Sequence, residues 1–324
     1  MNLRGRDYLL TQDFSVEEIQ QLIDRSLELK RAFKDGEPHR LLADKTLFMI
    51  FFDKSTRTRN SIEAGMTQLG GHAHFIDSTT SQIAHGESPK DMGTILSTYG
   101  HGIAIRHDLV SGEGQSYMRA VAEHAKIPIV NMQCDVDHPM QTLADLMTLQ
   151  EIYGQNLRGR KITVSWAYAP SYAKPMSAPQ GLITLMTRFG MDVTLAHPPG
   201  YELMKDQVAI AEANAANNGS KFEIVDDMDA AFEGAHIVYP KSWGAEDFFH
   251  RPEEGLELSR KYQDWICDER RMKLADSDCK YMHCLPADRG NEVTDAVIDG
   301  SQSVVYQEAE NRMHTAKAIL SETM

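Results

Sequence analysis

The stretch Thr46-Leu-Phe-Met-Ile-Phe-Phe52, with Ser55-Thr-Arg-Thr-Arg-Asn-Ser61 just after it, decides the fold of this chain. The first segment is a short apolar run rich in Phe and Ile, which predicts a buried strand. Ile62, Met66 and Leu69 then recur at helical spacing, so the strand leads through hydroxyl and arginine residues into a helix. The free N–H groups and the dipole of a helix start favour an anion, and two arginines add hydrogen bonds that suit phosphate. We interpret residues 55–61 as a phosphate site, against the alternative of an ordinary Ser/Thr cap with solvated arginines.

The composition is that of a globular protein, and its length suggests one large domain or two of ordinary size, of which we expect two. The chain has 324 residues, of which 42% are hydrophobic and 25% charged, and its apolar runs are far shorter than a membrane span. The formal net charge of −14 disfavours binding to DNA, RNA or anionic lipid, which depends on a basic surface. We therefore expect no nucleic acid and no membrane as partner, and a small anion around which arginine and histidine converge.

The cysteines and histidines indicate which cellular compartment and which cofactors to expect. The four cysteines show no Cys-x-x-Cys spacing, and the amino terminus lacks the apolar segment of a secretory signal, so we expect a reducing cytoplasm. The 13 histidines include no His-Glu-x-x-His motif. No metal and no other cofactor is expected.

Strand and helix patterns alternate along the first half of the chain. Strands are predicted at residues 46–52, 72–77, 102–106 and 127–130, and helices at residues 15–33, 55–69, 88–96 and 141–152. Ser15 with Glu18 forms a capping-box pattern before the first helix, and Ser88 precedes a proline at the start of the third. The last of these helices is long enough to join two domains.

The second half of the chain repeats this alternation of strand and helix patterns. Strands are predicted at residues 161–164, 192–195, 222–225, 236–239, 281–284 and 303–306. Residues 209–220 read as a surface helix ending in a turn, and the charged residues 251–264 read as a surface loop. The fold class is therefore α/β, with two doubly wound parallel-sheet domains joined by long helices.

Several chemistry-bearing stretches sit at or after predicted strand ends, where ligands bind in open α/β sheets. They are Arg106-His-Asp108, His138-Pro-Met-Gln141, His283-Cys-Leu-Pro286 and the proline-rich segment from Trp166 to Gln180. Each is weak alone, because a lone His or Cys at a strand end is usually structural, and the proline-rich segment also fits a rigid surface turn. Their joint placement with residues 55–61 indicates one functional rim.

Three ordered motifs, Ser-Thr-Arg-Thr-Arg, His-Pro-x-Gln and His-Cys-Leu-Pro, resemble the aspartate/ornithine carbamoyltransferase family, and the similarity extends to Glu310-Asn-Arg-Met-His314. The resemblance implies a carbamoyl phosphate-binding domain from residues 1–143 plus 309–324 and an amine or amino-acid substrate domain from residues 144–308. It also implies homotrimers with shared active sites, in which Gln82 reaches a neighbouring subunit.

The same resemblance implies the site residues. Carbamoyl phosphate would be bound by Ser55, Thr56, Arg57, Thr58, Gln82, Arg106, His138, Gln141, Cys284, Leu285 and Arg312. Attack of a neutral amine on the carbamoyl carbon creates an oxyanion, which Arg106, His138 and the Thr58 hydroxyl would stabilise. Carbamoyl phosphate is already activated, so orientation of the two reactants is expected to supply much of the rate without a covalent nucleophile.

Sequence details favour one branch of the family. Ornithine enzymes carry Ser-Met-Gly where this chain has Lys241-Ser-Trp-Gly244, and this motif resembles the knotted branch, which includes N-acetylornithine and N-succinylornithine carbamoyltransferases and an uncharacterised group. The acylornithine enzymes carry a tryptophan in a loop where residues 78–87 have none, and a lysine where this chain has Glu292. The resemblance therefore implies a trefoil-knot loop in the second domain. Residues 78–87 and 166–180 are most similar to the uncharacterised group, so the acceptor stays unassigned.

A lysine in the second pocket would suit a carboxylate, so we expect an amino acid or acylated amino acid as acceptor. The candidate contacts to this second substrate are Tyr168, Lys174, Lys241, Ser242, Trp243 and Glu292. A solvated Lys241 is the plain alternative. N-acetyl- or N-succinylornithine is the specific alternative acceptor, and a noncatalytic anion-binding or regulatory relative is the alternative of another class. A dinucleotide binder is disfavoured, because no Gly-x-Gly-x-x-Gly follows Phe52.

Overall fold

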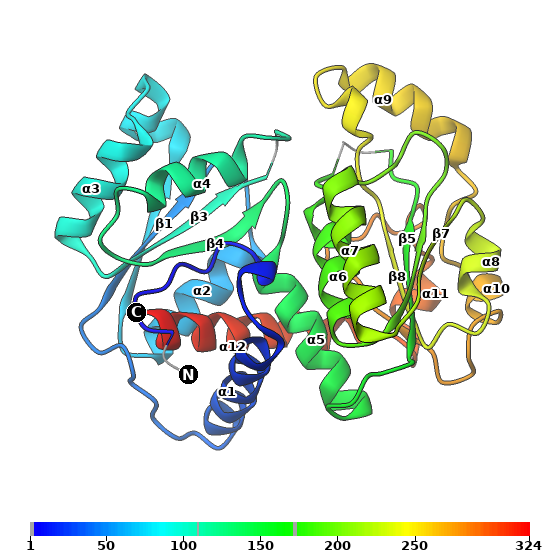
Figure 1. Ribbon diagram of the computed structural model, residues 1–324, viewed down its shortest axis with the longest axis horizontal. Helices are drawn as coiled ribbons and strands as arrows, with labels where there is room; N and C mark the ends of the chain where they lie inside the picture. The colour runs from blue at the N-terminus through cyan, green and yellow to red at the C-terminus, as the bar shows by residue number, and fades with distance from the viewer. Residues whose placement is uncertain (1–2, 109, 171–173) are drawn as a thin grey trace. The chain divides into compact units, whose positions relative to one another are not determined.

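The computed structural model describes residues 3–108, 110–170 and 174–324 (Figure 1). The chain divides into unit 1, residues 1–147 with 309–324, and unit 2, residues 148–308. Each unit holds one parallel sheet with helices on both faces, so the predicted fold class is confirmed. The helices α5 (Pro139–Tyr153) and α12 (Val305–Thr323) contain the two points at which the chain passes between the units.

Unit 1 is built on a four-stranded sheet in the order β2-β1-β3-β4. Its strands are β1 (Thr46–Phe51), β2 (His72–Asp77), β3 (Gly102–His107) and β4 (Ile129–Cys134). Its helices, besides α5 and α12, are α1 (Val16–Lys34), α2 (Arg57–Gln68), α3 (Pro89–Tyr99) and α4 (Gly114–Ala122), with 3-10 turns η1 (Thr11–Asp13), η2 (Ser78–Thr80) and η3 (Gln82–His85). The capping box of Ser15 and Glu18 and the cap by Ser88 form as predicted.

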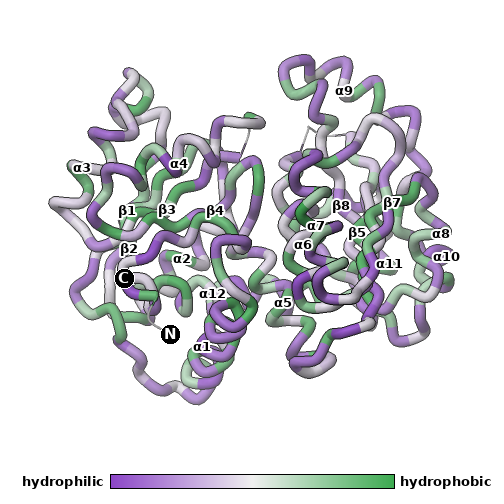
Figure 2. Tube along the Cα trace, in the orientation of Figure 1, coloured by the Kyte–Doolittle hydropathy of each residue, from purple (hydrophilic) through white to green (hydrophobic). Residues whose placement is uncertain are grey.

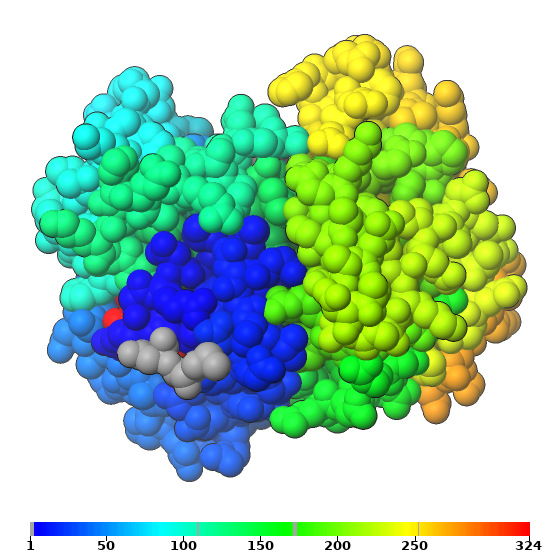
Figure 3. All heavy atoms as spheres, viewed as in Figure 1, coloured from blue at the N-terminus to red at the C-terminus, as the bar shows by residue number. Residues whose placement is uncertain are grey.

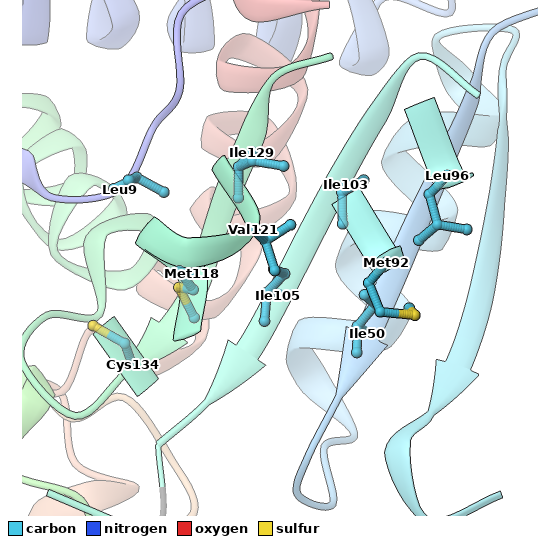
Figure 4. Close-up of a cluster of buried hydrophobic side chains, with 10 residues drawn as sticks. All are labelled: Leu9, Ile50, Met92, Leu96, Ile103, Ile105, Met118, Val121, Ile129 and Cys134. Carbon is cyan, nitrogen blue, oxygen red and sulfur yellow. The ribbon is translucent and has the colours of Figure 1, made fainter. Parts of the chain in front are cut away.

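The two faces of this sheet are covered by different helices. Helices α3 and α4 lie on one face, and α1, α2 and α12 lie on the other (Figure 1). The cluster on the α3 and α4 face joins Met92 and Leu96 of α3 to Ile50 of β1 and to Ile103 and Ile105 of β3 (Figure 4). The hydrophobic residues of β1 and β3 colour the tube green in Figure 2. Burial of these alternate side chains is the main stabilising term of the unit.

Helix α4 approaches the end of β3 very closely. A Cβ atom at Gly114 would lie 1.8 Å from the carbonyl oxygen of His107, so no larger residue fits there. Asp135, just after β4, fixes this helix start from the other side, since its carboxylate accepts from the amides of Gly112 (2.6 Å) and Gln115 (2.8 Å). The carboxyl ends of β3 and β4 are thereby held firmly beside each other.

Unit 2 is built on a five-stranded parallel sheet in the order β7-β6-β5-β8-β9. Its strands are β5 (Lys161–Trp166), β6 (Asp192–Ala196), β7 (Phe222–Val225), β8 (Ile237–Lys241) and β9 (Lys280–Tyr281). Its helices are α6 (Ser177–Arg188), α7 (Lys205–Asn218), α8 (Met228–Phe232), α9 (Pro252–Ser259), α10 (Glu269–Met272) and α11 (Asp295–Ile298), with 3-10 turns η4 (Glu246–Phe248) and η5 (Arg260–Tyr262). Helices α6 and α7 cover one face, and α8, α10 and α11 lie on the other (Figure 1).

Two sequence predictions for this half were wrong and one was too long. Residues 303–306 do not form a strand, because Val305 begins helix α12, and a short β-branched run does not by itself distinguish strand from helix. Residues 251–264 are not a loop but contain α9, whose first turn carries Glu253 and Glu254, as helix starts prefer. Strand β9 ends at Tyr281 and not at residue 284. The segment α9 forms part of the molecular surface (Figure 3).

A buried lysine joins α12 to α1 and α2 in unit 1. Lys317 has no exposed surface, and its ammonium donates to Gln68 Oε1 (2.9 Å), to His39 Nε2 (3.1 Å) and to the Leu29 carbonyl (3.4 Å). Burial lowers the pKa of Lys317 to about 8. Because the unfolded chain then holds this proton more tightly than the folded chain, folding stability gains with rising pH between the two pKa values.

We expect the Lys317→Met variant to lack this pH dependence. As the pH rises from about 8 to about 10.5, the wild-type protein should gain roughly 1 to 3 kcal/mol relative to the variant. Urea unfolding of both proteins across this range measures the difference, and other titrating groups cancel in the comparison. A difference in unfolding free energy that stays constant with pH would contradict the assignment.

Candidate active site

The start of α2 lies just beyond the carboxyl end of β1. The N-cap residue of this helix is Thr56, and within the described part of the chain its side chain makes no capping hydrogen bond. The amides of the first turn are therefore not taken by a cap, which leaves the helix start suited to an anion. Arg57 is the first helical residue and is half-buried. The nearby hydroxyls of Ser55 and Thr58 accept hydrogen bonds from two other arginines.

Those two arginines converge on the hydroxyl of Thr58. Arg312 of α12 donates from Nη2 to Thr58 Oγ1 at 2.6 Å, and Arg106 of β3 donates from Nη1 to the same oxygen at 3.4 Å and to Ser55 Oγ at 3.2 Å. Thr58 is 1% exposed. Three segments far apart in the sequence thus place two guanidinium groups and two hydroxyls together. Of the predicted residues, Ser55, Thr58, Arg106 and Arg312 form this cluster, which we call the cradle.

The cradle constrains the proton of Thr58. A hydroxyl has two lone pairs and one proton, and a guanidinium can only donate. Thr58 Oγ1 accepts from two guanidinium nitrogens, so its two acceptor positions are occupied. The hydroxyl proton must therefore point away from both arginines. This makes Thr58 a donor toward a ligand placed at the helix start.

The other arginine of the motif is used differently. Arg59 forms an ion pair with Glu63 (2.9 Å) and stacks over the ring of Phe75 at 3.7 Å. Arg59 and Phe75 also line a cavity of about 430 Å³ at the ends of β1 and β2, together with Ser55, Thr56 and Asp77. The cavity shares Ser55 with the cradle, so the helix start opens onto space large enough for a small ligand.

His138 and Gln141 lie at the amino end of α5 and are both buried. Gln141 donates from Nε2 to Asp145 Oδ1 at 2.7 Å. The preceding Asp137 anchors this segment to η1, since one carboxylate oxygen accepts from both the amide and the hydroxyl of Thr11 at 2.9 Å. Burial raises the pKa of Asp137 to about 6, although the Thr11 hydrogen bonds act against this rise. Sequence reasoning missed this anchor, for which the chain carries no local signal.

Gln82 is exposed and begins η3, where its Oε1 lies 3.2 Å from His85 Nδ1. The next residue, Ile83, packs against the core cluster on the α3 and α4 face. This contact fixes the base of the 78–87 loop while the Gln82 side chain faces outward. The predicted reach of Gln82 into a neighbouring subunit stays a prediction.

In unit 2 the carboxylate of Glu292 gathers donors from three loops. Its Oε2 accepts from Lys174 Nζ (2.7 Å) and from the amide of Asp288 (2.6 Å), and its Oε1 accepts from the amide of Ser242 (2.6 Å). His283 Nε2 lies 3.5 Å from Oε1. Burial alone would raise the pKa of Glu292, but His283 and Lys174 hold it well below its usual range. Glu292 is fully buried and charged, and it ties together the loops after β5, β8 and β9.

The remaining second-substrate candidates are also held inside unit 2. Lys241 is 5% exposed, and its ammonium donates to the carbonyls of Ser242 (2.7 Å) and Pro175 (3.2 Å). Trp243 is buried and donates from Nε1 to the Tyr201 carbonyl at 2.9 Å. Tyr168 is half-buried, and its amide donates to the carbonyl of Trp265. Their contacts to a substrate stay predictions.

Trp243 lines a small cavity of about 30 Å³ at the carboxyl edge of the sheet in unit 2. Its walls are Trp166, Tyr201 and Ala169 together with Leu256 of α9. The proline-rich segment 166–180 includes residues 171–173, which lie outside the described residues. The knot therefore stays a prediction.

Cys284 and Leu285 follow β9 in unit 2. Cys284 is a half-buried free thiol. Leu285 has a positive φ of 54° and precedes a cis peptide bond to Pro286, and its amide donates to His283 Nδ1 at 2.8 Å. Because Nδ1 accepts, the proton of the neutral His283 ring is assigned to Nε2, facing Glu292. The backbone of this loop is thus oriented by the same buried carboxylate that holds Lys174.

Within the described ranges, no group of three or more His, Cys, Asp or Glu residues is arranged to hold a metal ion. None of the described helices combines the length and hydrophobicity needed to span a membrane.

The chain is similar to known proteins over nearly its whole length. Residues 6–151 match the family model "Aspartate/ornithine carbamoyltransferase, carbamoyl-P binding domain", and residues 179–323 match "Aspartate/ornithine carbamoyltransferase, Asp/Orn binding domain". Among curated proteins, the chain is 39% identical to the "Putative carbamoyltransferase YgeW" of Escherichia coli (strain K12), over 98% of this chain and 90% of that protein. It is 38% identical to the ornithine carbamoyltransferase of Halalkalibacterium halodurans, over 99% of this chain and 96% of that protein.

Solved structures of carbamoyltransferases have the same fold. The ornithine carbamoyltransferase from Pyrococcus furiosus superposes with a TM-score of 0.90 at 37% identity, covering 100% of this chain and 98% of the other. Acetylornithine transcarbamylase complexed with acetylcitrulline superposes with a TM-score of 0.90 at 33% identity, covering 98% of each chain. Both the sequence motifs and the fold are therefore those of carbamoyl-transferring enzymes. The chain belongs to the aspartate/ornithine carbamoyltransferase family and is a carbamoyltransferase.

Proposed function

We propose that this enzyme transfers the carbamoyl group of carbamoyl phosphate to the amino group of an amino acid or acylated amino acid. The observation that carries the proposal is the convergence of Arg106 and Arg312 on Thr58 at the start of α2. Unit 1 binds the phosphate through Ser55, Thr56, Arg57 and Thr58 at the start of α2, and Arg312 adds a further positive contact. Unit 2 binds the acceptor.

The reaction follows from these roles. The lone pair of the neutral amine attacks the carbamoyl carbon, and the carbonyl oxygen becomes an oxyanion stabilised by Arg106, His138 and the Thr58 hydroxyl. The bond between carbon and the bridging oxygen then breaks, and that oxygen leaves with its electron pair as phosphate into the helix start. The amine proton passes to the departing phosphate, which leaves a ureido product. Gln141 and the backbone of Cys284 and Leu285 orient the carbamoyl amide.

The acceptor is proposed to carry a carboxylate, as an amino acid or an N-acylated amino acid does. Relatives support this class, since one solved acetylornithine transcarbamylase is complexed with acetylcitrulline and another with carbamyl phosphate and N-succinyl-L-norvaline. The candidate contacts are those named in unit 2 from Tyr168 to Glu292. Lys174 and Lys241 are engaged inside the unit, so the acceptor must displace or share their present partners.

The assembly is proposed to be a homotrimer in which Gln82 of each chain completes the site of a neighbour. Exposure of Gln82 on a loop fixed by Ile83 supports this role. The setting is proposed to be a reducing cytoplasm, supported by four cysteines that are all free thiols.

The test is turnover by the purified full-length protein. Carbamoyl phosphate is offered with a panel of amino acids, N-acetyl- and N-succinylornithine, and small diamines, and phosphate release and ureido product are measured together. We expect one acceptor class to give amine-dependent phosphate release matched by ureido product. The activity should collapse in Arg57→Ala and persist in Arg119→Ala, an exposed arginine of α4. Phosphate release that ignores every amine and the Arg57 change would reject the proposal.

A further inference from the structure

Asp108, two positions after Arg106, accepts two hydrogen bonds from its guanidinium group. Arg106 donates from Nε to Asp108 Oδ1 at 3.1 Å and from Nη2 to Asp108 Oδ2 at 2.9 Å. Residues two apart in extended chain point to the same side, so this paired hydrogen bond forms locally at the end of β3. The Asp108 side chain has no exposed surface and that of Arg106 is 14% exposed.

This grip determines where the third nitrogen of the guanidinium points. The group is planar and rigid, so fixing Nε and Nη2 also fixes Nη1. Nη1 is the nitrogen that lies 3.2 Å from Ser55 Oγ and 3.4 Å from Thr58 Oγ1. The pairing register between β3 and β4 also shifts at Ile105 and Arg106, an irregularity of the kind that redirects side chains next to active sites. Arg106 therefore enters the cradle in one orientation.

The carboxylate is costly to keep in this position. Burial raises the pKa of Asp108, and Arg106 opposes that rise while nearby Asp53 adds to it. A buried ion pair is seldom more stabilising than an apolar pair of the same size. Asp108 also cancels part of the positive charge that would hold a phosphate. Stability and phosphate affinity both fail to account for it, whereas orientation of Arg106 does.

We propose that Asp108 is a positioning residue that directs Arg106 Nη1 at the carbamoyl oxygen, so that the cradle discriminates carbamoyl phosphate from inorganic phosphate. The inference rests on the proposed function, in which Arg106 contacts the carbamoyl group. Discrimination follows because Arg106 Nη1 donates a hydrogen bond to the carbamoyl oxygen, which carbamoyl phosphate has and inorganic phosphate lacks. The negative charge of Asp108 meanwhile weakens the hold on the phosphate product and favours its release.

The test compares affinities for carbamoyl phosphate and for inorganic phosphate by calorimetry, which needs no knowledge of the acceptor. In Asp108→Asn, the affinity for carbamoyl phosphate should fall about 10-fold or more, the size expected for one lost charge-assisted hydrogen bond. The affinity for inorganic phosphate should stay unchanged or rise. Asp229→Asn is the matched control, because Asp229 forms a similar pair with Arg270 in unit 2, and its preference should equal that of the wild type.

A second variant separates positioning from general damage. If Asp108 acts through Arg106, adding Asp108→Asn to Arg106→Lys should cause no further loss of preference for carbamoyl phosphate. A wild-type protein that shows no such preference would reject the proposed function itself. A wild-type preference retained in Asp108→Asn would reject only the role of Asp108. Should that variant not fold, a crystal structure of the wild type with carbamoyl phosphate decides: an Arg106 that has left Asp108 overturns the inference.

Discussion

Replacing Thr58 by Val should lower kcat/KM for carbamoyl phosphate by about 10² to 10³, the cost typical of losing one donor to a developing oxyanion. Valine keeps the shape of the side chain and removes only the hydroxyl. That hydroxyl accepts from Arg312 at 2.6 Å and from Arg106 at 3.4 Å, so its own proton is committed to the ligand. The loss should fall mainly on kcat, because the donor strengthens as negative charge develops on the carbamoyl oxygen.

The same substitution should cost stability, because it removes one hydrogen-bond acceptor of a buried arginine. Arg312 is 5% exposed and Thr58 is 1% exposed, so water does not readily replace the lost bond. A decrease of about 1 to 3 kcal/mol in the unfolding free energy is expected. Thr58→Ser is the matched control, since it keeps the hydroxyl and removes a methyl group. Steady-state kinetics and urea unfolding of both variants provide the measurement. Equal activity in the Val and Ser variants would show that the hydroxyl proton does not serve the reaction.

Much of the fold was predictable because local chemistry and tertiary structure agree in it. The run from Thr46 to Phe52 becomes β1, and the hydroxyl and arginine stretch becomes the start of α2, as the change from an apolar run to helical spacing indicated. The predictions failed where a short segment has no period of its own. Residues 303–306 look like a strand, but they enter a helix whose identity is set by the nineteen residues of α12 as a whole.

The candidate site was predictable as a set of residues but not as a set of contacts. Parallel strand ends predicted that Arg106 would lie near Ser55, and its Nη1 does reach that hydroxyl. No periodicity in the sequence predicts that Arg312, 254 positions from Thr58, donates to its hydroxyl oxygen. The family resemblance indicated only that Arg312 belongs to the carbamoyl phosphate site. The role of Asp137 depends on Thr11, 126 positions away, which a single sequence cannot pair with it.

The contacts of Glu292 change the role that the sequence alone suggested for it. From the sequence it marked a departure from the acylornithine enzymes, since it stands where they carry a lysine. In the structure it is a buried carboxylate that accepts from Lys174, Ser242 and Asp288 at 2.6–2.7 Å. It therefore organises the loops that carry the second-substrate candidates. Its contribution should be structural first and catalytic through those loops.

Replacing Glu292 by Gln should destabilise the protein by about 3 to 5 kcal/mol, the size expected when one partner of a buried ion pair is removed. The glutamine has nearly the same shape, but its amide nitrogen is a donor and would face another donor, the Ser242 amide or the Lys174 ammonium. The charge of Lys174 would also lose its nearest counter-ion, at 2.7 Å. The exposed Glu254, paired with Arg251, offers a matched control in the same unit, and Glu254→Gln should change stability by less than about 1 kcal/mol.

The pH dependence gives the Glu292 prediction a second, independent readout. Burial opposes ionisation of Glu292, but His283 and Lys174 lower its pKa further than burial raises it. A carboxyl group with a lowered folded pKa stabilises the protein fully above its unfolded pKa, near 4.3, and the contribution disappears as pH falls through the folded value. The stability gap between wild type and Glu292→Gln should therefore be constant from neutral pH to about 5 and narrow only in stronger acid. A gap that closes near pH 6 to 7 would mean that Glu292 is not the charged organiser of these loops.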